Sequence, residues 1–528
     1  MIEKSMNLYK MLQSSALQFS EENALISKTE HIRYKELLPK INILANFFLE
    51  RGLRPGDRCA IVLRNSVEFV LTYFAFVKIG VTVVPINYLL KADEMQYIFN
   101  HAQVRGIITT SHFLRTVLKA SNEVRALSMV VVTGDEEEFN NVKMETVSQI
   151  DFSFYSHILK NSSYDKESES YSAESDSLAM VLYTSGTTGN PKGVMLSHKN
   201  LLFNLESCKK AVNVGQKDSF LCILPMFHTF AWTVCVLLPL SIGAPVIIVE
   251  SIRPFSEVIK AIFRHRAAVF VAVPQIYSAL TKVPFKKYFK FLLPVKFCVS
   301  GAAPLPKLVY EKFKEKFGIP LIEGYGLTET SPVVSLNPLN GKIIPGSVGL
   351  PIPDIQVKII DENGKTINKN NFVGELCVKG DNVMLGYYLL PKETNEAFLA
   401  DGWLKTGDMG RIDENGYIYI VDRKKDLIIV RGFNVYSQEI ENIIKEHPDV
   451  EDVAVIGIPD ETLDDHIKAF VIPKPDRKPD TKELFKLCRK SLAVFKWPKE
   501  IIIDADLPRS SLGKILKSKL KERFNNKN

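Results

Sequence analysis

Apolar and polar residues alternate in blocks over the first ninety residues of the chain. Apolar positions at helical spacing predict a helix over 34–48, and a mostly apolar stretch predicts another over 69–78. Two short apolar runs, 59–63 and 81–84, are typical of buried strands. This order of strands and helices predicts an α/β protein whose parallel sheet carries helices on both faces.

A second series of buried strands is predicted in the middle of the chain. Apolar runs at 178–183, 269–273 and 296–300 each have the length of a strand. The most apolar stretch, 234–249, is interrupted by prolines and a glycine and is too short to span a membrane as a helix. We therefore expect it to be buried strand and helix inside the protein.

The pattern changes to short alternating strands between residues 346 and 421. The sequence DENG at 413–416, followed by an alternating run, predicts a β-hairpin. Frequent turns of this kind predict a β-rich subdomain, such as a small barrel, at about 346–421.

Five charged residues, 422–426, lie between two apolar strands and can be either a solvated turn or an interdomain hinge. The chain after them has the pattern of a compact α+β unit, with helices expected over 438–446 and 481–492. The predicted architecture is a large N-terminal body with parallel α/β sheets (1–421), a hinge (422–426) and a small mobile C-terminal lid (427–528).

Residues 183–193, YTSGTTGNPKG, follow one of the predicted buried strands. Glycines expose backbone N–H groups, hydroxyls add donors and Lys192 adds a positive charge, so the stretch predicts a loop that grips phosphate. It is not the P-loop of NTPases, because Pro191 precedes the lysine and Gly193 follows it. The alternative is an ordinary polar turn.

Composition narrows the class of protein without identifying it. The 528 residues are 46% hydrophobic and 24% charged, with a net charge of +7 spread along the chain. This balance is weak evidence for nucleic-acid binding and suits an anionic substrate or an acidic membrane surface equally well. Seven cysteines without a CxxC pair, and no apparent signal peptide, favour a reducing cytoplasm. The nine histidines show no metal-ligand spacing.

The stretch at 183–193 closely resembles the phosphate loop of the adenylate-forming superfamily, which includes acyl-CoA synthetases, luciferases and peptide-synthetase adenylation domains. The segments 300–304, 323–329, 401–408 and 508–515 resemble its other signatures in the expected order. Within the superfamily, 401–408 and 422–441 are most similar to bacterial long-chain fatty acid–CoA ligases. Ser437 is one departure, because many of those enzymes have proline there.

This resemblance makes residues 1–421 an AMP-binding domain and implies ATP, Mg²⁺ and coenzyme A as cofactor and substrates. The implied nucleotide contacts are Thr184, Ser185, Gly186, Thr187, Thr188, Gly189, Lys192, Gly301, Ala302, Gly324, Tyr325, Gly326, Thr328, Asp408, Arg423 and Lys514. Within this set, the resemblance places Tyr325 on adenine and Asp408 on the ribose hydroxyls. It makes Lys192, Thr328, Glu329 and Lys514 catalytic, with Glu329 and Thr184 at Mg²⁺. In isolation, Asp408 would be read as a turn residue and Lys514 as solvated surface.

Other implied roles concern the lid and the acyl group. Lys425 matches the pivot position of the hinge, and Gly432 and Phe433 match the segment that approaches the coenzyme A thiol. His228 and Trp232 fall where the acyl pocket and its gating tryptophan lie in some long-chain enzymes, although either side chain can equally be packed core. The stretch 225–232 contains no acidic residue, which argues against an amino-acid substrate.

The predicted reaction is conversion of a fatty acid to acyl-AMP, followed by transfer of the acyl group to coenzyme A. The alternatives are an aryl-CoA ligase, a ligase that delivers to an acyl carrier protein, and a catalytically inactive nucleotide-binding scaffold. We expect no nucleic-acid partner and a cytoplasmic protein. Peripheral contact with the inner membrane face and a homodimer are left open.

Overall fold

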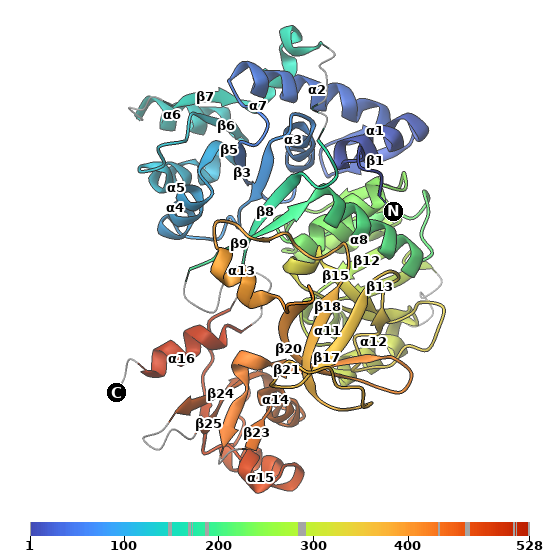
Figure 1. Cartoon of the computed structure of the whole chain (residues 1–528), viewed down its shortest axis with the longest axis vertical. Helices are drawn as coiled ribbons and strands as arrows, with labels where there is room; N and C mark the ends of the chain where they lie inside the picture. The colour runs from blue at the N-terminus through green and yellow to red at the C-terminus, as the bar shows by residue number, and fades with distance from the viewer. Residues whose placement is uncertain are drawn as a thin grey trace.

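Two large sheets form the body of the protein, and smaller sheets follow in the C-terminal third (Figure 1). The computed structural model describes residues 2–145, 150–166, 171, 173–184, 190–283, 292–430, 433–459, 465–509, 513 and 515–525. The strand orders are β19-β9-β8-β4-β3-β5-β6-β7 and β16-β15-β14-β13-β12-β10-β11-β1-β2. The central strands of both sheets run parallel, as the sequence predicted.

The first sheet consists of β3 (Arg58–Val62), β4 (Thr82–Pro85), β5 (Val104–Thr110), β6 (Met129–Thr133), β7 (Asp151–Phe154), β8 (Leu178–Thr184), β9 (Lys192–Ser197) and β19 (Gly386–Tyr387). The second consists of β1 (Asn23–Ile26), β2 (His31–Arg33), β10 (Phe220–Cys222), β11 (Val246–Ile248), β12 (Val269–Ala272), β13 (Phe297–Ser300), β14 (Leu321–Gly326), β15 (Val333–Leu336) and β16 (Leu350–Pro351).

The region predicted as a small barrel contains a four-stranded antiparallel sheet with β17 and β21 at its edges. Its strands are β17 (Gln356–Ile360), β18 (Gly374–Lys379), β20 (Leu404–Ile412) and β21 (Ile418–Arg423). The predicted hairpin is confirmed, because β20 and β21 pair on either side of residues 413–416.

The C-terminal part has a sheet of its own. It consists of β24 (Val450–Pro459), β25 (Asp465–Pro473) and β26 (Glu500–Ile503), with the short ribbon β22 (Ile428–Val430) and β23 (Phe433–Val435) beside it. Helices α14 (Ser437–Lys445) and α15 (Thr481–Ser491) pack on this sheet and confirm the two predicted helices, while α16 (Lys517–Asn525) is the last helix described.

Helices cover the large sheets on their outer faces and fill the space between them (Figure 1). They are α1 (Leu8–Gln18), α2 (Tyr34–Glu50), α3 (Val67–Lys78), α4 (Ala92–His101), α5 (Ser111–Ser121), α6 (Glu136–Glu145), α7 (Tyr155–Lys160), α8 (His198–Ala211), α9 (Leu238–Leu240), α10 (Phe255–Arg264), α11 (Pro274–Lys282), α12 (Lys307–Phe317) and α13 (Pro391–Ala397), with a π-helix, η2 (Ala231–Leu237). Helix α3 is buried over nearly its whole circumference, which explains why its sequence is almost entirely apolar.

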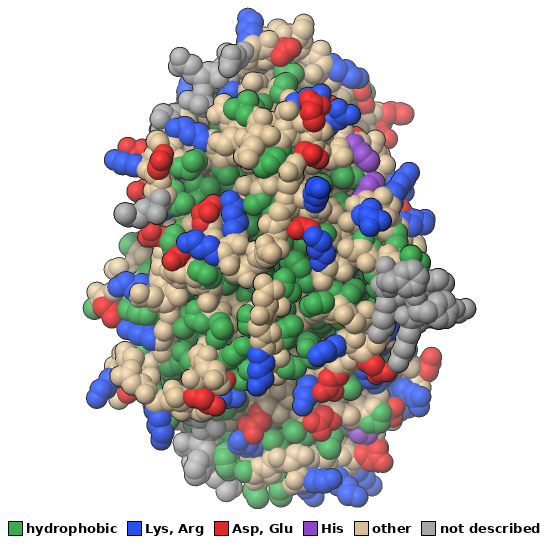
Figure 2. Space-filling model, turned by 90° about the vertical axis from the view of Figure 1, so that its right-hand side faces the viewer, with side chains coloured by type: hydrophobic (Ala, Val, Ile, Leu, Met, Phe, Trp, Pro, Cys, Tyr) green, Lys and Arg blue, Asp and Glu red, His purple; other side chains and the backbone are tan. Residues whose placement is uncertain are grey.

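The surface carries charged side chains of both signs. On the face in Figure 2, Lys and Arg side chains are interspersed with Asp and Glu side chains. Within the described part of the chain, no helix combines the length and apolarity needed to cross a bilayer.

We predict that Gly326→Ala destabilises the protein, because β14 passes very close to the residues that precede β15. A Cβ atom at Gly326 would lie 2.0 Å from the Pro332 carbonyl oxygen, which already accepts a hydrogen bond from the Leu327 amide. Because this clash can be removed only by moving the paired strands β14 and β15, we expect the free energy of unfolding to fall by about 3 kcal/mol. Urea denaturation measures it, with Gly215→Ala as control, since a Cβ at Gly215 meets no atom within 4 Å. Equal stability of the two variants would contradict the prediction.

Candidate active site

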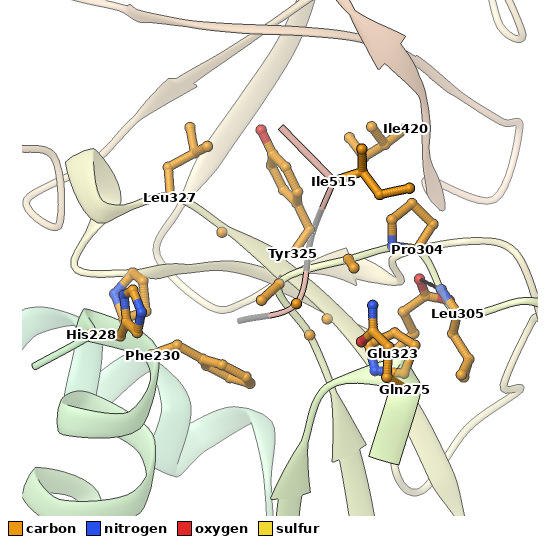
Figure 3. A pocket seen from close by; sticks show the side chains of 18 of the residues that line it. His228, Phe230, Gln275, Pro304, Leu305, Glu323, Tyr325, Leu327, Ile420 and Ile515 are labelled. Carbon is orange, nitrogen blue, oxygen red and sulfur yellow. Dashed lines mark hydrogen bonds between the residues drawn. The ribbon is translucent and has the colours of Figure 1, made fainter. Parts of the chain in front are cut away.

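A large cleft brings together residues from the body and from the C-terminal part. Its lining includes the strand β14, the loop that follows β13, the end of β21, and residues 513 and 515–519. In Figure 3, Tyr325 projects into the pocket from β14, and Ile515 reaches the same pocket from the C-terminal part. The cleft therefore unites signature segments that are far apart in the sequence.

Asp408 is held at one side of this cleft by two partners. It lies opposite Arg423 in the pairing of β20 with β21, and the Arg423 Nε is 2.8 Å from its Oδ1. Its Oδ2 accepts a hydrogen bond of 2.6 Å from the Tyr325 hydroxyl. Burial, followed by the Asp408 charge, raises the pKa of Tyr325 well above its usual value, so the phenol stays a donor. The sequence-predicted residues Tyr325, Asp408 and Arg423 thus form one connected group around the buried Asp408 carboxylate.

A second group surrounds Tyr387, which sequence reasoning missed. The Tyr387 hydroxyl donates to Glu329 Oε1 at 3.0 Å, and the Lys192 Nζ lies 5.2 Å from the centre of the Tyr387 ring. Burial and then the Glu329 charge raise the pKa of Tyr387 above its ordinary value. Tyr387 therefore contacts the predicted metal ligand through its hydroxyl and the predicted cation through its ring.

Thr328 lies in a short 3-10 turn, Thr328–Thr330, directly after β14. The Thr229 hydroxyl donates to the Thr328 hydroxyl at 3.2 Å. Thr229 is another residue that sequence reasoning missed, and only the adjacent His228 had drawn attention to its segment. This bond fixes the position of the Thr328 hydroxyl, which the resemblance makes a nucleotide contact and a catalytic group.

The donor set near Glu329 fits Mg²⁺. Glu329 offers a carboxylate, and Thr184 lies directly across from Lys192 where β8 pairs with β9. Among the residues that the structure describes, no group of three His, Cys, Asp or Glu side chains could enclose a metal on its own. Mg²⁺ is usually bound by one or two carboxylates together with substrate phosphates, so the Glu329 carboxylate is a suitable ligand for it.

Small residues in the signature segments allow close packing around the cleft. A Cβ at Gly301 would lie 2.8 Å from the Phe230 ring, and one at Gly324 would lie 2.9 Å from the Leu336 side chain. Ala302 adopts a left-handed backbone conformation, with φ of 66°. Gly301, Ala302, Gly324 and Gly326 all line the cleft.

Several predicted contacts cannot be placed. Ser185, Gly186, Thr187, Thr188, Gly189, Gly432 and Lys514 lie outside the described residues, as does the side chain of Phe433. Neighbouring residues are described: Asn190 and Pro191 line the cleft, and so do Gly513 and Ile515.

His228 lines the cleft and Trp232 does not belong to its described lining (Figure 3). Burial lowers the pKa of His228 to about 4, so its imidazole is neutral near pH 7. Trp232 is fully buried, with ring centres 5.3 Å from Phe69 and 4.3 Å from Tyr73. This packing is what a core residue requires, and the gating role of Trp232 stays a prediction.

Glu323 is a buried carboxyl group that sequence reasoning did not select. It precedes Gly324 in β14, lines the cleft, and accepts a hydrogen bond of 2.8 Å from the Leu305 amide. Burial raises its pKa from 4.5 to about 8, and the Leu305 N–H only partly opposes this shift. The only sequence signal was a charged residue at a buried position of an otherwise apolar strand.

Comparison with known proteins identifies the family. The model of the AMP-binding enzyme family matches residues 12–388, and that of the AMP-binding enzyme C-terminal domain matches residues 439–514. A long-chain-fatty-acid–CoA ligase of Bacillus subtilis (strain 168) is 36% identical, over 98% of this chain and 94% of the relative.

Two solved structures are similar to this chain over nearly its whole length. ATP-bound MatB from Rhodopseudomonas palustris is 30% identical with a TM-score of 0.87, over 99% of both chains. The O-succinylbenzoate coenzyme A synthetase MenE from Bacillus subtilis, in complex with ATP and magnesium ion, is 27% identical with a TM-score of 0.82, over 97% of this chain and 99% of that one.

The chain belongs to the AMP-binding enzyme family, whose members form adenylates. It is an acyl-CoA ligase of the AMP-forming type, which uses ATP with Mg²⁺ and takes coenzyme A as a substrate.

We predict that Glu323→Gln makes stability less dependent on pH. With its pKa raised to about 8, folded Glu323 holds a proton that the unfolded chain releases near 4.5, so its contribution to stability is lost as pH rises through this window. Between pH 5 and pH 9, Tm of the wild type should fall relative to that of the variant by on the order of 5 °C. Calorimetry at several pH values measures the difference. Glu311→Gln, at an exposed position of α12, is the control, and the same pH profile for all three proteins would refute the assignment.

Proposed function

We propose that this enzyme activates long-chain fatty acids and transfers them to coenzyme A. The observation that carries the proposal is a cleft with a polar end, built around Asp408 and Glu329, and a large apolar lining. The apolar side chains come from α8, η2, α9 and both large sheets, and they include Phe220, Val234, Leu238, Val269, Val299 and Val333. An alkyl chain gains free energy from such a lining in proportion to the area removed from water.

The polar end suits the charges of the first reaction. In that step, a carboxylate oxygen of the acid bonds to the α-phosphorus of ATP, and the bond to the β-phosphate oxygen breaks, so pyrophosphate leaves. Lys192 and the Thr328 hydroxyl would meet the negative charge that develops, and Asp408 with Tyr325 would hold the nucleoside. Bound Mg²⁺, with Glu329 as ligand, would neutralise part of the phosphate charge.

The second reaction requires another set of groups. The coenzyme A sulfur bonds to the acyl carbon and AMP leaves with the carboxylate oxygen. We propose that residues 427–528 act as a lid that turns at Lys425 between the reactions. This movement withdraws Lys514 and brings Gly432 and Phe433 toward the thiol, while residues 1–421 stay in place.

Lys514→Ala should separate the two reactions. Loss of this charge should slow formation of acyl-AMP on the order of 10²–10³-fold, because Lys514 is proposed to act only in the first step. Conversion of supplied acyl-AMP to acyl-CoA should change little. Pyrophosphate exchange measures the first reaction and thioester formation the second. An equal loss in both would remove Lys514 from its proposed role.

The substrate class is tested with a pool of short, medium and long fatty acids and aryl acids, incubated with Mg-ATP with and without coenzyme A. Mass spectrometry should show long-chain acyl-CoA only when coenzyme A is present. Preferred aryl-CoA products would favour the alternative suggested by the likeness to MenE. Acyl-AMP that never becomes a CoA thioester would point to a carrier protein, and no product from any acid would support an inactive scaffold.

A further inference from the structure

The first turn of α14 is capped by the carboxylate of Asp422, the first residue of the proposed hinge. The N-cap residue of this helix, Tyr436, makes no capping hydrogen bond through its side chain. Instead, Asp422 Oδ2 accepts from the Ser437 hydroxyl at 2.8 Å and from the Gln438 amide at 3.3 Å. A carboxylate is favourable at a helix N-terminus because it meets free N–H groups and the positive end of the helix dipole.

The same hydroxyl is joined to Lys517 at the start of α16. The Lys517 Nζ donates to Ser437 Oγ at 2.5 Å and lies 2.7 Å from Glu441 Oε1. Burial alone would lower the pKa of Lys517, but the charges of Glu441 and Asp422 raise it above its ordinary value. The ammonium group can only donate, so the Ser437 hydrogen is directed to Asp422. We call Asp422, Ser437 and Lys517 the hinge clasp.

The hinge clasp connects two parts of the chain that are otherwise held separately. Asp422 is fixed in the body, where it pairs with Met409 between β20 and β21. Among the described residues, the side-chain hydrogen bonds that join the two sides of Lys425 all end on Asp422. The orientation of the C-terminal part therefore depends strongly on this carboxylate.

Lys517 of the hinge clasp closely follows the segment of Gly513 and Ile515, which lines the cleft. Arg509 bridges to Ile515, donates to the Gly513 carbonyl at 2.6 Å and pairs with Asp452 of β24 at 2.9 Å. Lys517 follows this segment by two residues. Gly513 and Ile515, the described neighbours of Lys514, are consequently presented to the cleft by a support anchored at both ends.

We propose that Ser437 is a positioning residue, whose hydroxyl holds the C-terminal part in the orientation that presents the segment around Gly513 and Ile515 to the nucleotide end of the cleft. Proline would also suit the first turn of this helix, but it has no hydroxyl to join Asp422 with Lys517. A turn at Lys425 would move Ser437 away from Asp422, so the clasp should favour acyl-AMP formation over the thioester step. This inference rests on the proposed two-step function.

Ser437→Ala tests the clasp, with Ser437→Thr as the variant that keeps a hydroxyl. We expect the alanine variant to lower the rate of pyrophosphate exchange about 10-fold, the effect of one hydrogen bond to a charged group. Thioester formation from supplied acyl-AMP should be unchanged, and threonine should restore most of the exchange. Ser491→Ala, at an exposed position of α15, controls for substitution in the C-terminal part. Equal losses in both reactions, or no change in exchange, would overturn the proposal.

Trypsin cleavage after residues 423–425 provides a readout that needs no substrate. Loss of the hydrogen bond should raise the fraction of molecules in which this linker is open to the protease. Ser437→Ala should therefore be cut about 5-fold faster than the wild type or Ser437→Thr under native conditions. Equal cleavage rates in the three proteins would overturn the proposal even if no acid supports exchange. Exchange failing with every acid in the wild type, while the cleavage rates differ as expected, would refute the proposed function and leave the clasp standing.

Discussion

The ion pair between Asp408 and Arg423 is the constraint on which the geometry of the cleft depends. The Asp408 side chain is 3% exposed, and a buried carboxylate without a partner would cost several kcal/mol. The register of β20 and β21 supplies the guanidinium directly across the sheet, and the remaining oxygen takes the Tyr325 hydroxyl. One strand pairing thereby fixes the nucleotide end of the cleft and also the strand from which the proposed hinge begins.

The linker that follows β21 is held by polar contacts, whereas the parts on either side of it are held by apolar cores. Among the described residues, two clusters of buried apolar residues contain only residues from 428 onward, and the other three contain only residues before 421. Among the described residues, the side-chain hydrogen bonds across Lys425 end on a single carboxylate, Asp422. Polar contacts are directional and can be exchanged for contacts with water at small net cost, whereas separating two halves of an apolar core costs free energy in proportion to its area. A linker held in this way is suited to reorientation of the C-terminal part relative to the body.

Local sequence patterns were sufficient for much of the fold. The segments that form α2 and the β20–β21 hairpin agreed with their structures, because local spacing of apolar residues determined which face was buried. The segment that forms α3 agreed because an almost entirely apolar helix is buried on all sides. The signature segments also selected Tyr325, Asp408 and Arg423, which the structure brings together.

Contacts between distant segments could not be predicted in the same way. Tyr387 meets Glu329 only because β19 pairs with β9, and Thr229 meets Thr328 only through the packing of η2 against the second sheet. An apolar run such as 231–237 also has no periodicity that distinguishes a π-helix from an α-helix.

The raised pKa of Glu323 has a consequence for the charge of the cleft. Near neutral pH this carboxyl is uncharged, so the strand that carries Tyr325 and ends before Thr328 adds no negative charge at this position. In alkaline solution the same group becomes an anion inside a poorly screened cavity, where it repels other anions strongly. The proton on Glu323 therefore keeps one negative charge out of the cleft near neutral pH.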